Sequence, residues 1–126
     1  MIVLDTAALL YWTLQSASLS TKAMSSIRQA DEIVVSAMSV WEIGIKAKRG
    51  NLTLPGPLEA YVDRIKAAYK IRIIAVDEHI WMENVALNWS HKDPADRTIV
   101  ATAQIHQCNL VTPDHIIRDF YKKAIW

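Results

Sequence analysis

The sequence lacks a set of cysteines, a basic leader and any long apolar run. Its single cysteine, Cys108, excludes an internal disulfide framework and fits a reducing compartment as a core residue. The first apolar run contains Asp5 and no basic residue, which argues against a signal peptide. No stretch approaches the roughly 18 uninterrupted apolar residues of a membrane span. We therefore expect a cytoplasmic protein that does not associate with a membrane.

The chain also carries almost no net charge. A formal charge of +1 excludes the broad basic field with which many proteins coat nucleic acids, and leaves room for a local basic patch beside an acidic site. The 126 residues are 52% apolar and 21% charged, which is an ordinary globular composition. A chain of this length buries enough surface for one core, so we expect a single domain over residues 1–126.

Short, β-branched apolar runs predict four strands, at residues 1–5, 32–37, 71–76 and 109–112. They lack polar alternation, as expected of strands that are covered on both faces. Stretches with helical spacing follow or separate them, at residues 7–15, 21–30, 39–49, 57–69, 78–89 and 94–107. Strands that alternate with helices predict an α/β fold, a three-layer α/β/α domain with a short, mostly parallel central sheet.

Acidic residues stand where these strands end. Asp5 ends the first strand, Glu42 lies in the helix after the second, and Asp114 follows the fourth. Asp96 lies in the first turn of helix 94–107, which must begin at the same edge because it leads back to the fourth strand. Sites in such sheets form outside the carboxyl ends of the strands, so these four acids are predicted to converge there.

Most of these acids also have a purely structural explanation. Ser39 and Glu42 fit a capping box at the start of a helix. Asp93, directly before a proline, is typical of an N-cap, and the helix dipole favours Asp96 in the first turn. Asp114 fits a turn or a cap. Taken singly, these explanations compete with a shared metal site.

Asp5 is different, because a carboxylate at the end of a buried strand is costly unless it is paired or bound to a cation. No lysine or arginine precedes Lys22. Two carboxylates about 5 Å apart repel by roughly 3 kcal/mol at an effective dielectric near 20, and divalent cations relieve that cost. Oxygen ligands select Mg²⁺ or Mn²⁺ over zinc. The histidines have no zinc-ligand spacing, and we interpret the two near the site, His91 and His115, as local hydrogen-bonding groups.

Four segments resemble the PIN-domain family, and among PIN domains the VapC-type toxins of prokaryotic toxin–antitoxin pairs. They are "IVLDTAALLYW" (2–12), "SVWEIGIKAKRGNLTL" (39–54), "HKDPADRTIVATAQ" (91–104) and "LVTPDHIIRDF" (110–120). The resemblance covers nearly the whole chain in the expected order, and its second and third segments are fairly specific. The chain departs from the commonest pattern at Ala95, where a bulky aromatic residue is frequent.

The resemblance implies a site and an activity. Asp5, Glu42 and Asp96 match the acidic positions that hold Mg²⁺ or Mn²⁺ in the family, Asp114 matches a more variable fourth, and Asp93 matches a structural position at the helix entry. The implied protein is a metal-dependent endoribonuclease that hydrolyses RNA phosphodiester bonds as the toxin of a toxin–antitoxin pair. Small hydroxyl residues next to the acids, Thr6 and Thr112, are expected to hydrogen-bond a carboxylate or a metal water.

The resemblance also implies partners, namely RNA, a small antitoxin that covers the active site, and a second copy in a homodimer. Candidate phosphate contacts are Lys46, Lys48, Arg49 and Arg97, for which a solvated helix end is the competing explanation. Helices 7–15 and 21–30, with Leu10, Tyr11 and Leu14, are either an antitoxin-docking surface or part of the core. The tryptophans at 12, 41, 81 and 89 favour core or interface packing over base stacking.

Three alternative functions compete with this one. A haloacid-dehalogenase-like phosphatase also begins with "VLDT", but Ala7 stands where that superfamily has a second acid. A non-catalytic PIN-like module for RNA binding or scaffolding is disfavoured by the presence of all four acids. A housekeeping PIN nuclease in RNA maturation has the same chemistry as a toxin and differs in its biology.

Overall fold

A parallel β-sheet forms the middle layer of the structure, a computed structural model that describes residues 1–126. Its five strands lie in the order β3-β2-β1-β4-β5, and all four pairings are parallel. The strands are β1 (Ile2–Leu4), β2 (Ile33–Ser36), β3 (Ile71–Ile74), β4 (Asn109–Val111) and β5 (Ala124–Ile125). The four predicted strands are present with slightly shorter bounds. The fifth, β5, was not predicted, because two residues carry no recognisable period.

Seven α-helices and one short 3₁₀-helix surround the sheet. They are α1 (Thr6–Leu14), the 3₁₀-helix η1 (Ser16–Ser18), α2 (Thr21–Gln29), α3 (Ala37–Lys48), α4 (Leu58–Ala67), α5 (Glu78–Ala86), α6 (Pro94–Ile105) and α7 (His115–Phe120). Six of them match the predicted helices within a few residues. The seventh, α7, has six residues, which is too short for a helical pattern to be evident in the sequence.

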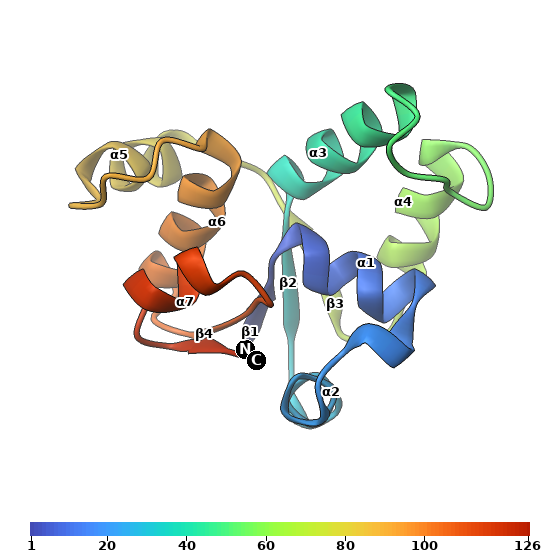
Figure 1. The fold of residues 1–126 in the computed structure, drawn as a ribbon, viewed down its shortest axis with the longest axis horizontal. Coiled ribbons are helices and arrows are strands. Elements are labelled where there is room, and N and C mark those ends of the chain that lie inside the picture. The colour runs from blue at the N-terminus through green and yellow to red at the C-terminus, as the bar shows by residue number, and fades with distance from the viewer.

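The strands separate two hydrophobic cores. In β1, Ile2 and Leu4 face a core made with α1, α2, α3 and α4, whereas Val3 faces a second core made with α5, α6 and α7. Val34 of β2 and Leu110 of β4 also face the second core. Figure 1 shows the two groups of helices apart, with the strands between them. The predicted three-layer α/β/α arrangement is therefore confirmed, and it explains why these strands show no polar alternation.

The start of α3 differs from the prediction. The helix begins at Ala37, and Ser36 at the end of β2 is its N-cap, because the Ser36 hydroxyl accepts a hydrogen bond from the Met38 N–H at 3.1 Å. Ser39 is fully buried inside the helix, and its hydroxyl oxygen lies 2.9 Å from that of Thr6. The capping box of Ser39 and Glu42 is therefore wrong. Glu42 lies in the second turn and has no capping role.

The sequence predicted a buried free cysteine and no helix that spans a membrane. Cys108 is a free cysteine packed in the second core, as predicted. Among the helices, none combines the length and the apolar character that crossing a bilayer requires.

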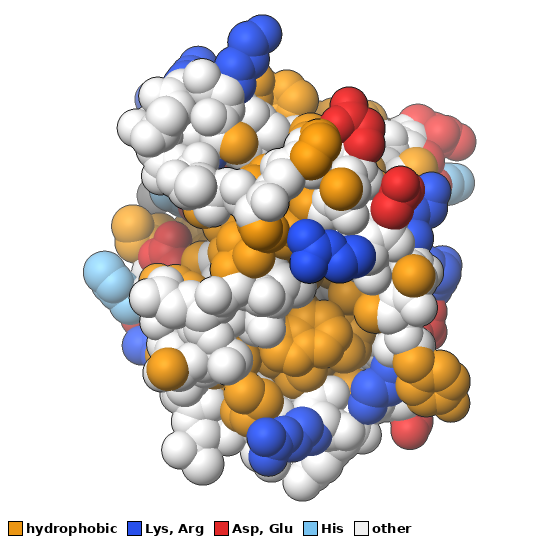
Figure 2. Space-filling view, turned by 90° about the vertical axis from the view of Figure 1, so that its right-hand side faces the viewer, with side chains coloured by type: hydrophobic (Ala, Val, Ile, Leu, Met, Phe, Trp, Pro, Cys, Tyr) orange, Lys and Arg blue, Asp and Glu red, His pale blue; other side chains and the backbone are white.

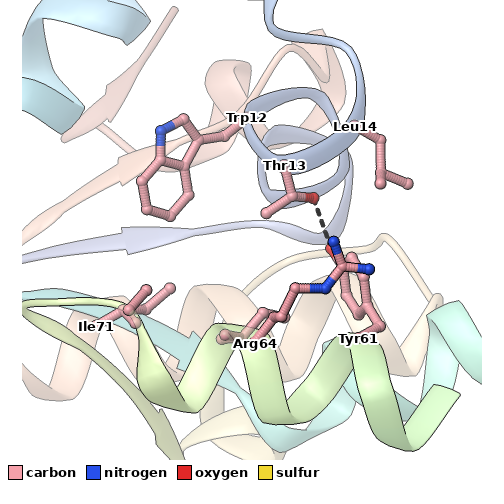
Figure 3. Close-up of a pocket in the computed structure, with 8 residues that line it drawn as sticks. Trp12, Thr13, Leu14, Tyr61, Arg64 and Ile71 are labelled. Carbon is pink, nitrogen blue, oxygen red and sulfur yellow. Dashed lines mark hydrogen bonds between the residues drawn. The ribbon is translucent and has the colours of Figure 1, made fainter. Parts of the chain in front are cut away.

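An apolar hollow opens on the side of the molecule that carries α1 and α4, and Figure 2 shows lysine and arginine side chains around it. It is a cavity of about 240 Å³ lined by Trp12, Thr13, Leu14, Tyr61, Arg64, Ile65, Ala68 and Ile71. Inside it, the hydroxyl oxygens of Thr13 and Tyr61 lie 2.8 Å apart and link α1 to α4 (Figure 3). Of the three residues predicted for antitoxin docking, only Leu14 lines this cavity, while Tyr11 faces the ring of Trp126 at a centroid distance of 6.1 Å.

Candidate metal centre

Asp5 stands between β1 and α1, and it is the only buried carboxylate of the chain, with an exposed fraction of 5%. Its Oδ1 accepts a hydrogen bond from the Ala8 N–H at 2.7 Å, so Asp5 is also the N-cap of α1. Removal from water raises the pKa of Asp5 to about 7, although hydrogen bonds from Thr112 and Ala8 oppose the rise. The charges of Asp96 and Asp114 raise this pKa further. An ordinary cap would lie in solvent, so burial sets this aspartate apart.

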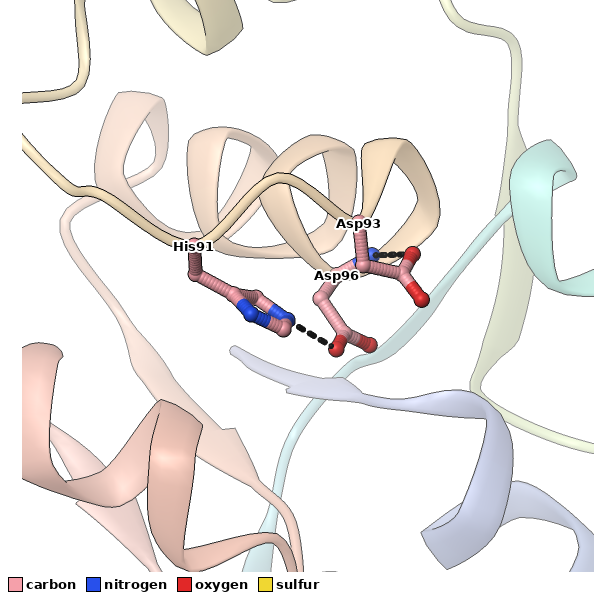
Figure 4. Close-up of side chains that lie close together, drawn as sticks. All are labelled: His91, Asp93 and Asp96. Carbon is pink, nitrogen blue, oxygen red and sulfur yellow. Dashed lines mark hydrogen bonds and ion pairs between the residues drawn. The ribbon is translucent and has the colours of Figure 1, made fainter.

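Asp96 lies half-buried in the first turn of α6, and its carboxylate has a single hydrogen-bond partner in the protein. Its Oδ2 lies 2.8 Å from Nε2 of His91, and Figure 4 shows the imidazole directed at the carboxylate. Burial raises the pKa of Asp96, the hydrogen bond to His91 lowers it, and the charges of Asp93 and Asp114 raise it. His91 is therefore a local hydrogen-bonding group, as predicted.

Asp93 has a different role from Asp96, although both lie at the start of α6. Its Oδ1 accepts hydrogen bonds from the N–H groups of Ala95 at 2.9 Å and Asp96 at 3.2 Å, which makes it the N-cap, with Pro94 directly after it. This capping role agrees with the prediction. Ligand atoms of His91, Asp93 and Asp96 all lie within 4.8 Å of one another, which is a spacing that a metal ion can bridge.

Glu42 reaches the site from α3. Its half-buried carboxylate is hydrogen-bonded to the hydroxyl of Thr6, the residue that follows Asp5. Burial raises the pKa of Glu42, the Thr6 hydrogen bond and the charge of Lys46 lower it, and the charge of Asp96 raises it. Thr6 is thus one of the hydroxyl groups beside the acids that the sequence indicated.

Asp114 follows β4 and is the N-cap of α7, because its Oδ1 accepts a hydrogen bond from the Ile116 N–H at 2.9 Å. Its own N–H donates to Oγ1 of Thr112 at 3.0 Å, and the Thr112 side chain is hydrogen-bonded to Asp5. Strands β1 and β4 are paired neighbours, so their ends bring Asp5 and Thr112 to the same level. The predicted cap at Asp114 is present and leaves its second oxygen, Oδ2, without a hydrogen bond.

The four predicted acids lie at the carboxyl ends of β1, β2 and β4 and at the start of α6. The charge of Asp96 raises the pKa of both Asp5 and Glu42, and the charge of Asp114 raises the pKa of Asp5 and of Asp96. The acids therefore act on one another electrostatically. The sequence predicted a hydrogen-bonding role for His91 near the site, but it did not identify Asp96 as the partner.

The donor set fits a hard divalent cation. The chain contains two ion pairs, between Arg72 and Glu32 and between His91 and Asp96, so no lysine or arginine forms an ion pair with Asp5, Glu42 or Asp114, and Lys46 acts on Glu42 through its charge alone. Carboxylates without an ion-pair partner are the ligands that Mg²⁺ and Mn²⁺ prefer, and of the four predicted acids only Asp96 belongs to the group, with His91 and Asp93, whose ligand atoms all lie within 4.8 Å of one another. A cation held by these oxygens removes both the mutual repulsion and the cost of burying Asp5.

The basic residues near the site fall into two groups. Lys46 and Lys48 lie in the last turn of α3, and Arg49 is its C-cap; all three side chains are exposed. Arg97 is half-buried, and its guanidinium donates to main-chain carbonyls at the end of α5 and in the segment that follows. The interpretation of Arg97 as a phosphate contact is therefore corrected, because its Nη atoms are already engaged within the protein.

Residues 2–123 match the PIN domain. The chain belongs to the PIN-domain family. This PIN domain is 32% identical over 118 residues to Ribonuclease VapC22 of Mycobacterium tuberculosis, and the match covers 93% of this chain and 89% of that protein. The predicted family is thus confirmed by a relative of similar length.

Solved structures share the same fold. One is a toxin–antitoxin complex from Klebsiella pneumoniae, with a TM-score of 0.70 and 21% identity over 100% of this PIN domain and 97% of that chain. Another is VapBC2 from Rickettsia felis bound to a DNA fragment from its promoter, with a TM-score of 0.69 and 14% identity over 95% and 93% of the two chains. At these identities the likeness establishes the three-layer fold of the family.

Proposed function

We propose that this PIN domain is an endoribonuclease that uses Mg²⁺ or Mn²⁺ held by Asp5, Glu42, Asp96 and Asp114. The observation that carries the proposal is the burial of Asp5, whose pKa is raised to about 7 and which has no basic partner. A buried acid coupled to further acids is typical of a functional site. The similarity to Ribonuclease VapC22 over 93% of the chain supports RNA as the substrate class.

The chain's own residues have distinct roles in this proposal. Asp5 and Asp96 are direct ligands, Glu42 binds through one oxygen or a bridging water, and Asp114 completes the set. Thr6 holds the Glu42 carboxylate in place through their hydrogen bond. A divalent cation at this site supplies charge neutralisation at the phosphate and activates water near neutral pH. His91 is engaged with Asp96, so the proposal assigns it no role as a base.

The RNA backbone is expected to reach the acids along α3. Lys46, Lys48 and Arg49 lie at the C-terminal end of this helix, which also carries Glu42. Basic side chains contact phosphates without reading the base sequence, so these three residues supply affinity and register. They also offset the negative potential that the acids present to an approaching RNA.

The biological role that fits this enzyme is the toxin of a toxin–antitoxin pair. The likeness to VapC22 and to the toxin–antitoxin complexes supports this role, and the apolar cavity between α1 and α4 supports a docking site for an antitoxin segment. Such a segment would place an apolar side chain in the cavity and acidic side chains near Arg64 (Figures 2 and 3).

A second copy of the chain is the other proposed protein partner. Apolar side chains are exposed on α3 and α5, where Trp41 is 59% exposed, Trp81 44% and Met82 58%. A surface of this kind is typical of a protein interface. A homodimer that covers this surface fits the expected toxin.

The test uses purified protein freed of any partner and incubated with total RNA in Mg²⁺ or Mn²⁺, against a reaction with EDTA. Asp96→Asn removes a proposed ligand, and Asp63→Asn makes the same change on the exposed surface of α4 as a control. Discrete metal-dependent cuts that are lost only in Asp96→Asn support the proposal. Equal cutting by all proteins would identify a contaminating nuclease. Absence of cutting together with absence of metal binding in calorimetry would indicate a non-catalytic RNA-binding or scaffold module.

A further inference from the structure

Arg97 directly follows Asp96 in α6, and its guanidinium donates hydrogen bonds to main-chain carbonyls of an earlier part of the chain. Nη1 donates to the carbonyl oxygens of Trp89 at 2.6 Å and His91 at 3.0 Å. Nη2 donates to those of Asn84 at 2.6 Å and Leu87 at 3.2 Å. One side chain therefore binds the last turn of α5 and the irregular segment that connects it to α6.

Of these carbonyls, that of Asn84 lies in the last turn of α5, Leu87 is the C-cap of the helix, and the other two lie beyond it. The last four carbonyls of a helix have no partner within the helix, and a cation at that end is favoured by the helix dipole. A guanidinium satisfies several acceptors at once, because its donors form a rigid planar fork. Arg97 makes no ion pair with Asp93 or Asp96, so its charge is balanced by carbonyl dipoles and the acids stay available for a metal.

The segment held by Arg97 leads directly to the metal site. His91, whose carbonyl is bound by Nη1, places its Nε2 2.8 Å from Oδ2 of Asp96. The His91 ring packs against Trp89 at a centroid distance of 4.8 Å, and Trp89 stacks on Phe120 of α7 at 4.5 Å. The two carbonyls bound by Nη1 thus belong to His91 itself and to Trp89, the residue against which the imidazole packs.

We propose that Arg97 is a positioning residue of the metal site: by fixing the main chain at Trp89 and His91, it holds the His91 imidazole against Asp96 and sets the direction of that carboxylate. The role in catalysis rests on the proposed RNA cleavage, whereas the effect on metal affinity rests only on the proposed metal site. Partners that orient a metal ligand typically change metal affinity by 10- to 100-fold when they are removed.

The test compares Arg97→Lys and Arg97→Met with Tyr61→Phe. Lysine keeps the charge but cannot reproduce the fork, and methionine removes both. Tyr61→Phe deletes the hydrogen bond to Thr13 on the opposite face of the sheet, and it controls for a loss of stability without a change near the acids. For each protein, Mn²⁺ affinity is measured by calorimetry, unfolding by urea titration, and kcat and KM on the same RNA. The Nε2–H resonance of His91 is followed by NMR.

We expect both Arg97 variants to fold, to bind Mn²⁺ about tenfold more weakly and to lose the hydrogen-bonded Nε2–H resonance of His91. With RNA, kcat falls about tenfold, while KM changes less than threefold. Tyr61→Phe is expected to lose stability and to keep the wild-type Mn²⁺ affinity and His91 resonance. A tenfold loss of affinity in the lysine variant shows that the fork, and not the charge, is required.

Several results would overturn the inference. Wild-type Mn²⁺ affinity in both Arg97 variants would reduce Arg97 to a structural residue. A rise in KM alone, with unchanged kcat and Mn²⁺ affinity, would identify a phosphate contact instead. Failure of both variants to fold would show that the whole domain, rather than Asp96, depends on this side chain. If the wild type binds Mn²⁺ and cuts no RNA, the proposed function fails, and the calorimetry still decides the role of Arg97.

Discussion

The side chains of Thr6 and Glu42, which are 36 positions apart in the sequence, are hydrogen-bonded across α1 and α3. The hydroxyl of Ser39, one turn before Glu42, lies 2.9 Å from the same threonine oxygen. Thr6 follows Asp5 directly, so this contact joins the end of β1 to the helix that begins after β2. The contact holds the Glu42 carboxylate beside the residue that follows Asp5, and it thereby aligns two of the four acids.

Thr6→Val tests this contact. The Thr6 hydrogen bond lowers the pKa of Glu42, so its loss raises that pKa and shifts the acidic limb of the pH–rate profile to higher pH. A hydrogen bond to a charged group contributes about 1.5 kcal/mol or more, so activity near neutral pH is expected to fall about tenfold. The control is Thr13→Val on the same helix, whose hydroxyl contacts Tyr61. Superimposable profiles for the two variants would contradict the proposed role of Thr6.

Asp5→Asn is expected to stabilise the protein in EDTA, and most strongly at neutral or higher pH. The pKa of Asp5 is about 7 in the folded protein, against 3.8 for an exposed aspartate, so between these pH values the folded state holds a proton that the unfolded state has lost. Wild-type stability therefore falls as pH rises from about 4 to 7 and stays low above 7.

The measurement is urea unfolding of wild type and Asp5→Asn at pH 5 and pH 8. At pH 8 the variant should gain roughly 2–4 kcal/mol over the wild type, because asparagine carries no buried charge. At pH 5 the gain should be much smaller, because Asp5 is then mostly protonated in the fold. An equal gain at both pH values would show that burial of the charge is not its cause.

Asp93 and Asp96 are expected to respond oppositely to the same substitution. Asparagine caps helices about as well as aspartate, so Asp93→Asn should keep the N-cap of α6 and most of the activity. Asp96→Asn replaces a proposed ligand and should lower kcat by at least 100-fold with little loss of fold. Circular dichroism and RNA cleavage measured on both variants check this pair, and a loss of activity confined to Asp93→Asn would reverse the two roles.

Added Mn²⁺ should stabilise the folded protein only when the proposed metal ligands are intact. At a Mn²⁺ concentration 100 times its Kd, binding contributes about 2.7 kcal/mol to the free energy of unfolding. The wild-type Tm is expected to rise by a few degrees with Mn²⁺ and to return after EDTA. Asp96→Asn should show no such rise, whereas the surface variant Asp63→Asn should behave as the wild type. A similar rise in all three proteins would indicate a metal site elsewhere.

The layered fold was predictable because its evidence is local. Apolar runs without alternation indicate strands buried on both faces, and Asp93 before Pro94 marks a helix start without reference to the rest of the chain. The start of α3 was not predictable in this way, because both Ser36 and Ser39 suit a cap. In the structure Ser36 is the N-cap, and the Ser39 hydroxyl instead contacts Thr6 of another helix, a contact that the local sequence does not reveal.

Arg97 shows the other limit of the sequence. Its neighbour in the chain is Asp96, which suggested a role at the phosphate, but its hydrogen-bond partners are carbonyls between Asn84 and His91. Main-chain acceptors have no residue-type signature, so no pattern in the sequence predicts them. The identities of the four acids came from the sequence, and the arrangement that supports them came from the structure.

Asp5, Asp93 and Asp114 each use Oδ1 to begin a helix. A descendant of this protein that had lost its chemistry would still benefit from Asp93 and Asp114 as it folds, whereas the buried charge of Asp5 would lower its stability. The retention of Asp93 and Asp114 in related chains is thus a weak sign of a working enzyme. Glu42 and Asp96 cap no helix, so a related chain that keeps both has kept them for the site. A related chain that has lost either of them is the first candidate for an inactive descendant.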